Sequence, residues 1–436
     1  MSDTPFSARA RLQAMLDVEA ALAEAEAAIG VIPRTAARSI RACARVETLD
    51  EGLIESEAQR EGNVAIPMIR QLTARVAASD PEAARYVHWG ATSQDIIDTA
   101  FVLQLRAAVP PVIADLFRAA DAAAAHAERH VKTTMVGRTW LQQATPITFG
   151  LKAAGWCDSL DRATDHLESA LAGACVLQFG GATGTLAALG DRGPDVAAGF
   201  AQTLGLSVPA IPWHSHRERF AVLACALGVA TGAAGKIGRD LGLLAQTEIG
   251  EAHEPDSSSG GSSTMPHKQN PVRATIAISA AIRAPGLVST TLSAMLQEHE
   301  RGLGGWQAEW DTIPALVSTA GQAASALAGA LEALVVDPDR MRANLNMTGG
   351  LILAESIAMR LAPEMGKREA HAAIKRAAAR RTAGGESFAD VLASDPAVSA
   401  ILDRSEIDKA LSPDDYLGST ANFVAAVLSR RSHRKK

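Results

Sequence analysis

The sequence contains few aromatic residues, and its charges nearly balance. Phe, Trp and Tyr make up only 4% of its 436 residues. This scarcity disfavours an all-β sandwich, whose strands are enriched in aromatic side chains, and a platform on which nucleic-acid bases stack. The formal net charge of −6 gives no general attraction to nucleic acid either. We therefore expect no nucleic-acid partner.

Cysteines and long apolar runs are also scarce. The four cysteines, at positions 43, 157, 175 and 225, form no CxxC pair, so we expect reduced, buried side chains of a cytosolic protein. The N-terminus has no basic start followed by an apolar run, and no uninterrupted apolar run reaches the roughly 18 residues of a membrane span. The sequence thus predicts a cytoplasmic protein with no membrane partner, whose basic tail (residues 430–436) is a solvated terminus.

The abundant feature is helical periodicity in a chain that is 47% hydrophobic. Its clearest stretch covers residues 216–250 and predicts a helix roughly 50 Å long. Four glycines along it, at positions 228, 232, 235 and 238, predict close contact between helices. A small globule cannot cover such a helix, so we expect a long bundle shared between subunits. The apolar seam consists of Phe220, Leu223, Leu227, Ala230, Ala234, Ile237, Leu241 and Leu244.

Prolines suggest where the chain divides. Pro110-Pro111 and Asp337-Pro338 indicate breaks between helical stretches. We predict an N-terminal helical domain (1–109), a central domain of long helices (110–345) and a C-terminal helical domain (346–436). Two segments depart from the helical period: the Gly-rich residues 177–190, predicted to be an ordered turn region, and the Ser/Gly loop 254–265, of a kind that is usually functional or disordered. Further helices are predicted over residues 8–29, 112–130, 146–172, 272–297 and 315–334.

The polar loop leads into the string GSSTMPHKQNP at residues 261–271, directly before a predicted helix. Hydroxyls, a cation and amides are concentrated there, and a helix N-terminus offers free N–H groups and the positive end of the helix dipole. These features predict a carboxylate-binding site. A solvated linker before a helix explains the composition equally well.

This string resembles the signature loop of the fumarase/aspartase superfamily, whose pattern is GSSxMPxKxNP. Two further segments resemble the same superfamily: HWGATSQDIIDT at residues 88–99 and GRTWLQQATP at residues 137–146. All three occur in the superfamily's order and spacing, so the resemblance covers essentially the whole chain. It implies an all-α, three-domain subunit with a central bundle of long helices. It also implies a homotetramer whose active sites combine segments of different subunits.

Within the superfamily, the segments are most similar to the bacterial branch that cyclises 3-carboxy-cis,cis-muconate, a small polycarboxylate. The resemblance implies an enzyme with no metal and no organic cofactor. The chemistry moves a proton on a carbon next to a carboxylate, so donors and cations must stabilise a doubly charged aci-carboxylate. Ser262 corresponds to the catalytic base and needs Lys268 and other positive charge to lower its pKa. The implied substrate-binding residues are His88, Thr92, Ser93, Gln94, Thr139, Trp140, Gln142, Asn270 and Arg301.

Three positions depart from the superfamily pattern. Lyases that expel nitrogen carry a histidine and a glutamate where this chain has Trp140 and Thr275, and Gln143 stands where close relatives are expected to have another histidine. A leaving nitrogen needs a proton, and a positioned acid contributes about 10²–10⁴-fold. A carboxylate, with a pKa near ~4, leaves as a stable anion without one. The departures therefore favour a cycloisomerase.

Several alternatives remain at this point. The substrate could be a sulfonate-bearing muconate, which would suit the same cations. The enzyme could be a fumarate-releasing lyase of the adenylosuccinate or argininosuccinate type, which would use the same fold. The protein could also be a helical scaffold without catalytic activity. Arg301 lies in the polar segment 298–307, whose composition is also typical of a solvated helix end. Arg138 is a second candidate for a substrate-binding cation. His214 and His216 are predicted to be surface histidines, because no third metal ligand follows them at a suitable spacing.

Overall fold

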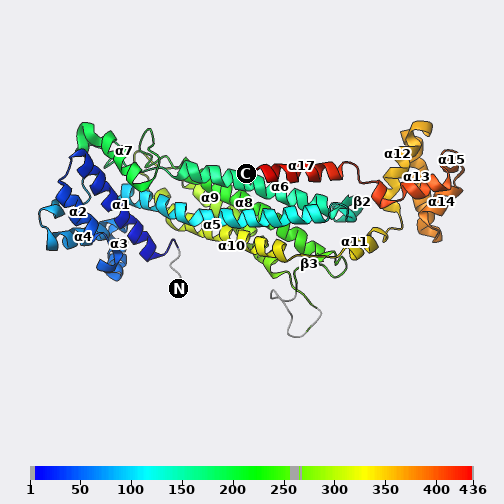
Figure 1. Cartoon of the computed structure of the whole chain (residues 1–436), viewed down its shortest axis with the longest axis horizontal. Helices are drawn as coiled ribbons and strands as arrows, with labels where there is room; N and C mark the ends of the chain where they lie inside the picture. Colours follow the sequence, from blue (N-terminus) through cyan, green and yellow to red (C-terminus); the bar gives the residue numbers. More distant parts are fainter. Residues whose placement is uncertain (1–4, 256–264, 266–267, 435–436) are drawn as a thin grey trace. The chain divides into compact units, whose positions relative to one another are not determined.

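The computed structural model describes residues 5–255, 265 and 268–434. Within these residues the regular structure is helical apart from four short strands, which form two antiparallel pairs (Figure 1). The all-α prediction is therefore confirmed. The chain divides into two compact units. The first contains Met1–Ala114, Ala163–Gly232 and Ala280–Gln322, and the second contains Asp115–Arg162, Ala233–Ser279 and Ala323–Lys436.

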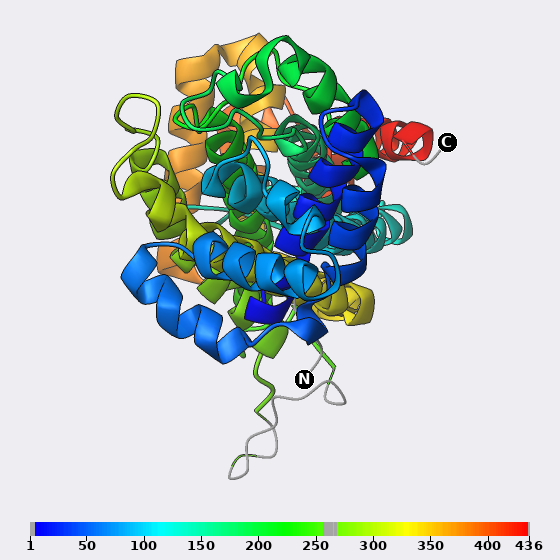
Figure 2. The same cartoon turned by 90° about the vertical axis from the view of Figure 1, so that its left-hand side faces the viewer.

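In the first unit, five helices pack together: α1 contacts α2 and α7, and α4 contacts α2 and α3 (Figures 1 and 2). Helix α1 has the bounds that the sequence predicts: the Ser7 hydroxyl accepts a hydrogen bond from Ala10 N at its start, and Gly30 ends it in a left-handed conformation. The five helices are α1 (Ala8–Ile29), α2 (Arg34–Cys43), α3 (Glu51–Glu61), α4 (Ala65–Ser79) and α7 (Gly193–Leu204).

In the second unit, short helices enclose an apolar core that includes Ile357, Leu361, Phe388, Leu392 and Ile407. The helices around this core are α12 (Ala354–Met365), α13 (Lys367–Gly384), α14 (Phe388–Ser394), α15 (Pro396–Ser399) and α16 (Arg404–Ala410). Of the other two helices in this unit, α11 (Pro338–Leu345) contacts β1 (Thr134–Thr139), and α17 (Thr420–Arg434) runs beside α6 (Phe149–Ala174) (Figure 1). This unit also holds the strand pairs β1 (Thr134–Thr139) with β2 (Gln142–Thr148) and β3 (Ala252–His253) with β4 (Val335–Val336).

Five long helices contribute residues to both units: α5 (Ser93–Arg129), α6 (Phe149–Ala174), α8 (Glu218–Leu244), α9 (Val272–Ser293) and α10 (Gly305–Ala333). All eight residues of the predicted seam are buried in α8. The helix has 27 residues, or about 40 Å, and is shorter than predicted at both ends. Beyond Leu244 the chain turns, and Gly250 takes a positive φ of 60°.

The structure contradicts the helix break that the sequence predicts at Pro110-Pro111. The expected break is absent, since both prolines lie inside α5. The loss of two N–H donors is outweighed by tertiary packing, because Val109 and Val112 beside them are buried. The three-domain division itself stays a prediction.

The described part of the basic tail, residues 430–434, is not the solvated terminus that the sequence predicts. Residues 430–434 are the last turns of α17, where the guanidinium of Arg431 is buried and bonds Asp121 and Asp161. Arg430, whose side chain is exposed, also forms an ion pair with Asp158. Carboxylates on α5 and α6, distant in sequence, therefore bind the tail to the second unit, which local composition could not indicate.

The cysteines are free, as predicted, but only Cys157 is buried; Cys43, Cys175 and Cys225 are half-buried. The glycines of α8 meet the prediction of close helix contact at two positions. A Cβ on Gly228 would lie 2.7 Å from Val288 Cγ2, and one on Gly238 would lie 2.9 Å from the backbone oxygen of Ala274, both on α9. A Cβ added at Gly232 would meet no described atom within 4 Å apart from the backbone of its own helix.

Gly238→Ala is expected to destabilise the protein by about 1–3 kcal/mol, because a backbone oxygen cannot move aside cheaply. Gly155→Ala is the matched control: Gly155 is also a helical glycine of the second unit, but a Cβ added there would meet no described atom within 4 Å. There the gain in helix propensity should stabilise by about 0.5–1 kcal/mol. Denaturant unfolding of both variants tests this, and effects of the same sign would contradict close packing at Gly238.

Candidate active site

The first predicted segment is organised by a residue that sequence reasoning missed, Asp95. Its carboxylate is fully buried near the start of α5. Oδ2 accepts hydrogen bonds from Thr92 N (3.0 Å) and Gly181 N (2.9 Å), and Oδ1 accepts one from Gly180 N (3.0 Å). These bonds attach the helix start to the Gly-rich turn. The Thr-x-x-Asp spacing, typical of a helix-capping box, is the sequence signal that could have found it.

His214 corrects a second expectation. It was predicted to lie on the surface, but it is 4% exposed, and its Nε2 lies 2.6 Å from Asp95 Oδ1. Its neighbours Trp213 and Arg217 are buried as well, so this segment passes through the core of the first unit. The described part of the chain contains no group of three His, Cys, Asp or Glu residues that could hold a metal ion.

Gln94 is buried, and its whole amide is engaged. Nε2 donates to Asp98 Oδ2 (3.1 Å) and to the backbone oxygen of His214 (2.9 Å), and Oε1 accepts from Nε of Arg301 (3.1 Å). Arg301 also donates through Nη2 to the backbone oxygen of Ala182 (3.1 Å). Within the described residues nothing bonds its Nη1, and the side chain is exposed. Gln94 therefore orients Arg301, which presents one edge of its guanidinium outward.

A buried ion network lies beneath this arrangement. The guanidinium of Arg217 bonds Asp98 at 2.6 and 3.0 Å and Glu309 at 2.5–3.1 Å. It also lies over the rings of Trp213 and Phe220, about 5 Å from their centroids. Burial opposes its charge, but the two carboxylates outweigh burial and raise the pKa of Arg217. The network joins α5, the start of α8 and α10, and thereby holds Gln94 in place.

His88, Thr92 and Ser93 complete the cluster of the first unit, and all three are half-buried. His88 bonds Glu19 on α1. Among the described residues, no acceptor bonds the backbone N–H groups of Ser93 and Gln94 in the first turn of α5. The structure thus brings together five of the predicted residues: His88, Thr92, Ser93, Gln94 and Arg301.

The second predicted segment forms a β-hairpin, which the helical periodicity of the sequence did not predict. Strands β1 and β2 are joined by the two residues Trp140 and Leu141, with φ angles of 52° and 63°. Two consecutive positive φ values match a type I′ turn, which normally requires Asn-Gly. Non-glycine residues held there store strain of the kind that occurs at functional sites. Trp140 is 99% exposed, and Thr139 and Gln142 beside it are exposed too.

Two neighbours of the hairpin tip are engaged within the second unit. Arg138 binds Glu251 with both arms, at 2.7 and 2.8 Å, and Glu251 is fully buried. Its charge is therefore used inside the protein, which argues against Arg138 as a substrate-binding cation. Gln143 donates weakly to the backbone oxygen of Asn344 (3.4 Å).

The signature loop is partly described. Ser262 lies outside the described residues, whereas Lys268 is exposed and Asn270 is half-buried just before α9. Two backbone amides in the first turn of α9 are taken by the chain's own Glu254, so they are not free for a substrate carboxylate, while the site predicted on the loop residues stays a prediction. Glu254 accepts hydrogen bonds from Arg273 N (3.2 Å) and Ala274 N (2.9 Å). The next amide, Thr275 N, bonds the backbone oxygen of Pro271, as does the Thr275 hydroxyl.

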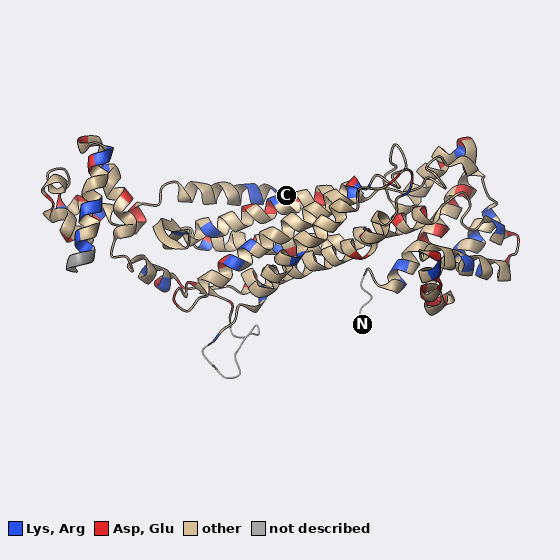
Figure 3. Ribbon diagram, turned by 180° about the vertical axis from the view of Figure 1, so that it is seen from behind, with Lys and Arg blue, Asp and Glu red and all other residues tan. Residues whose placement is uncertain are grey.

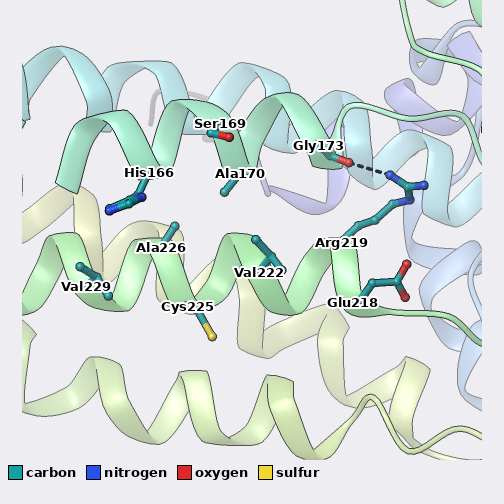
Figure 4. A pocket seen from close by; sticks show the side chains of 10 residues that line it. All are labelled: His166, Ser169, Ala170, Gly173, Glu218, Arg219, Val222, Cys225, Ala226 and Val229. Carbon is teal, nitrogen blue, oxygen red and sulfur yellow. Dashed lines mark hydrogen bonds between the residues drawn. The ribbon is translucent and has the colours of Figure 1, made fainter. Parts of the chain in front are cut away.

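A groove of about 520 Å³ lies between α6 and α8 in the first unit (Figure 4). Arg219 closes one end by donating to the backbone oxygen of Gly173 (3.1 Å), and exposed Val222 and Val229 lie along α8. None of the predicted site residues lines this groove. It is therefore a surface feature of the bundle helices and not the candidate active site.

The chain is similar to known proteins over nearly its whole length. The family profile described as lyase matches residues 4–286, and that described as adenylosuccinate lyase C-terminus matches residues 350–427. The chain is 48% identical over 425 residues to 3-carboxy-cis,cis-muconate cycloisomerase of Pseudomonas aeruginosa, covering 97% of this chain and 93% of that protein. It is 42% identical over 431 residues to nitrosuccinate lyase of Streptomyces davaonensis, covering 97% and 91%. The solved 3-carboxy-cis,cis-muconate lactonizing enzyme from Pseudomonas putida aligns with a TM-score of 0.92 at 45% identity, covering 99% and 96%.

Proposed function

This chain belongs to the lyase family, within the fumarase/aspartase superfamily, and we propose that it interconverts 3-carboxy-cis,cis-muconate and 4-carboxymuconolactone. The observation that carries the proposal is the exposed Trp140 at the strained hairpin tip, where nitrogen-expelling lyases have a histidine. In those lyases a glutamate partners the histidine, and this chain has Thr275 at that position. The Thr275 hydroxyl donates a hydrogen bond to the backbone oxygen of Pro271. A site without this acid pair suits a carboxylate leaving group, which departs as a stable anion.

The reaction balances without a cofactor. In lactone formation, an oxygen of one substrate carboxylate bonds to a carbon of a C=C double bond. The electron pair of that double bond moves to the neighbouring carbon, next to a second carboxylate, and this carbon takes up one proton. In the reverse direction the same proton is removed, a role that we propose for Ser262. The negative charge spread over the second carboxylate is the feature that the site must stabilise.

The cluster of the first unit is suited to bind carboxylates. Arg301 offers a guanidinium edge, the first turn of α5 offers the amides of Ser93 and Gln94, and Thr92 and Ser93 carry hydroxyls. We propose that Lys268 and Asn270 add a cation and an amide from the signature loop. The hairpin tip would contribute three further substrate-binding residues, which are Thr139, Trp140 and Gln142. Segments of different subunits would together complete each site.

One second candidate is favoured by specific findings. The match to the adenylosuccinate lyase C-terminus and the likeness to a nitrosuccinate lyase support a lyase that releases fumarate from a succinyl adduct. Purified protein should be incubated in parallel with 3-carboxymuconate, 3-sulfomuconate, argininosuccinate, adenylosuccinate and nitrosuccinate. We expect the conjugated-diene absorbance of 3-carboxymuconate to decay. Fumarate release from a succinyl adduct, with a stable diene, would establish the second candidate instead.

We also propose that the protein is a cytoplasmic homotetramer whose long helices pack against those of other copies. By length and composition alone, α5, α8 and α9 could cross a membrane. The ribbons of the long helices carry few charged residues (Figure 3). Exposed apolar side chains on α8 and α9 include Val222, Val229, Ile282 and Leu292. Apolar surface of this extent is typical of helices that continue their packing in an oligomer.

The variant Ile282→Glu is expected to shift the protein towards monomers or dimers, because a charge would be buried in the interface without a partner. Leu53→Glu is the matched control, since Leu53 is an exposed leucine on the polar helix α3. Sedimentation velocity of the purified proteins measures the outcome. A wild-type monomer, or an Ile282→Glu tetramer of unchanged stability, would contradict the assembly.

A further inference from the structure

One face of α1 carries two buried glutamates in different surroundings. Glu19 is 1% exposed and Glu26 is 0% exposed, and seven residues, or two helical turns, separate them. Oε1 of Glu19 lies 2.7 Å from Nδ1 of His88. Neither carboxyl oxygen of Glu26 has a hydrogen-bond partner in the described chain. The structure therefore contains a paired carboxyl and an unpaired one on the same helix face.

Burial and neighbouring charges govern the protonation of Glu26 and of His88. Burial, reinforced by the nearby Glu19, raises the pKa of Glu26 to about 9, so Glu26 carries a proton. At His88, burial opposes protonation, but Glu19, its hydrogen bond and Asp95 together outweigh burial and raise the pKa of the imidazole. The charged groups facing His88 are thus Glu19 on α1 and Asp95 on α5, and Asp95 is itself bonded to His214. Both carboxylates favour an imidazolium.

The geometry of His88 directs its other nitrogen outward. Its φ of 59° places a non-glycine residue in the left-handed region, a strained conformation that the surrounding fold must maintain. Nδ1 faces the buried Glu19, the side chain is 19% exposed, and among the described residues nothing bonds Nε2. The same turn leads directly to Thr92 and Ser93 at the start of α5.

We propose that Glu19 is a positioning residue that holds His88 as a fixed imidazolium, whose Nε2–H donates to a carboxylate of the substrate in the transition state. This inference deepens the proposed function and rests on it. A charge-assisted hydrogen bond becomes stronger as the aci-carboxylate gains its second negative charge, so the bond favours the transition state over the bound substrate. No proton leaves His88 in this role, and the proton balance at carbon is unchanged.

The test uses the same substitution at both glutamates. Glu19→Gln removes the charge that favours the imidazolium, while burial of His88 remains, so the pKa of His88 should fall. Activity should then be lost as pH rises through this lower value and regained on acidification. We expect kcat/KM for 3-carboxymuconate to drop about 10–100-fold above pH 7, with the alkaline limb of the profile displaced to lower pH. Glu26→Gln replaces a protonated carboxyl by a neutral amide and should leave the profile within about twofold at every pH.

A double variant separates positioning from general damage. If Glu19 acts through His88, then Glu19→Gln combined with His88→Gln should be no slower than His88→Gln alone. An equal loss at every pH in Glu19→Gln, or additive losses in the double variant, would overturn the inference. Titration of the His88 imidazole by NMR in wild type and Glu19→Gln needs no turnover, and an unchanged pKa would also overturn it. A wild-type protein that leaves 3-carboxymuconate intact would instead contradict the proposed function.

Discussion

Ser262→Ala is expected to lower kcat for lactone formation and opening by about 10²–10⁴-fold, the range attributed to a positioned acid–base group. In the reaction described above, the proton on the carbon next to a carboxylate moves in every turnover, and no other side chain is proposed to exchange it. Alanine removes only the hydroxyl oxygen and its proton, so the substitution changes the chemistry of the side chain more than its size. Steady-state kinetics of wild type and variant, with sedimentation velocity on both, measure the effect.

Ser258→Ala provides the matched control for this loss. Ser258 belongs to the same Ser/Gly loop but precedes the signature string. Its variant should retain activity within about twofold, since no proton transfer is assigned to it. A Ser262→Ala enzyme that keeps wild-type kcat and assembly would remove the serine from its role as base. A loss of equal size in Ser258→Ala would show that the loop tolerates no change, and would not support a specific base.

Arg217→Met is expected to destabilise the protein by about 3–5 kcal/mol, because Asp98 and Glu309 would remain buried without their cation. The methionine preserves much of the apolar contact with Trp213 and Phe220. The loss of stability therefore measures the effect of the unpaired carboxylates and not the effect of a missing side chain. Urea unfolding at a fixed protein concentration measures the change. Arg217→Met should also raise KM, because Asp98 holds Gln94, and Gln94 orients Arg301.

Arg85→Met serves as the control for Arg217→Met. Arg85 forms an exposed ion pair with Glu82 three residues away, and such pairs contribute about 0–1 kcal/mol. Equal destabilisation by the two variants would contradict a buried network as the support of the site.

The helices were predictable where their signal is local. The α1 bounds follow from Ser7 and Gly30, which cap its ends, and the seam of α8 follows from spacings of three and four. The α5 helix was not predictable through Pro110-Pro111, because the packing that tolerates two prolines comes from residues distant in sequence. The hairpin tip was missed for a related reason: Trp140 and Leu141 occupy turn positions that residues of their type rarely take.

The candidate site likewise combines residues that the sequence could predict with contacts that it could not. The resemblance selected His88, Thr92, Ser93, Gln94 and Arg301, and the structure places them in one cluster. The resemblance could not reveal that Gln94 orients Arg301, because these residues are 207 positions apart in the sequence. Nor could it reveal the buried contact between Asp95 and His214, which are 119 positions apart. Glu254 is a similar case: its carboxylate lies 19 residues from the helix N-terminus that it fills.

The most direct measurement follows 3-carboxymuconate and the purified chain in D₂O, with the diene absorbance and the NMR spectrum of the product recorded together. We expect the absorbance to decay and each lactone formed to carry one deuteron on the carbon next to a carboxylate. A stable diene at micromolar enzyme, or a lactone without deuterium at that carbon, would contradict proton transfer to carbon as the reaction of this site.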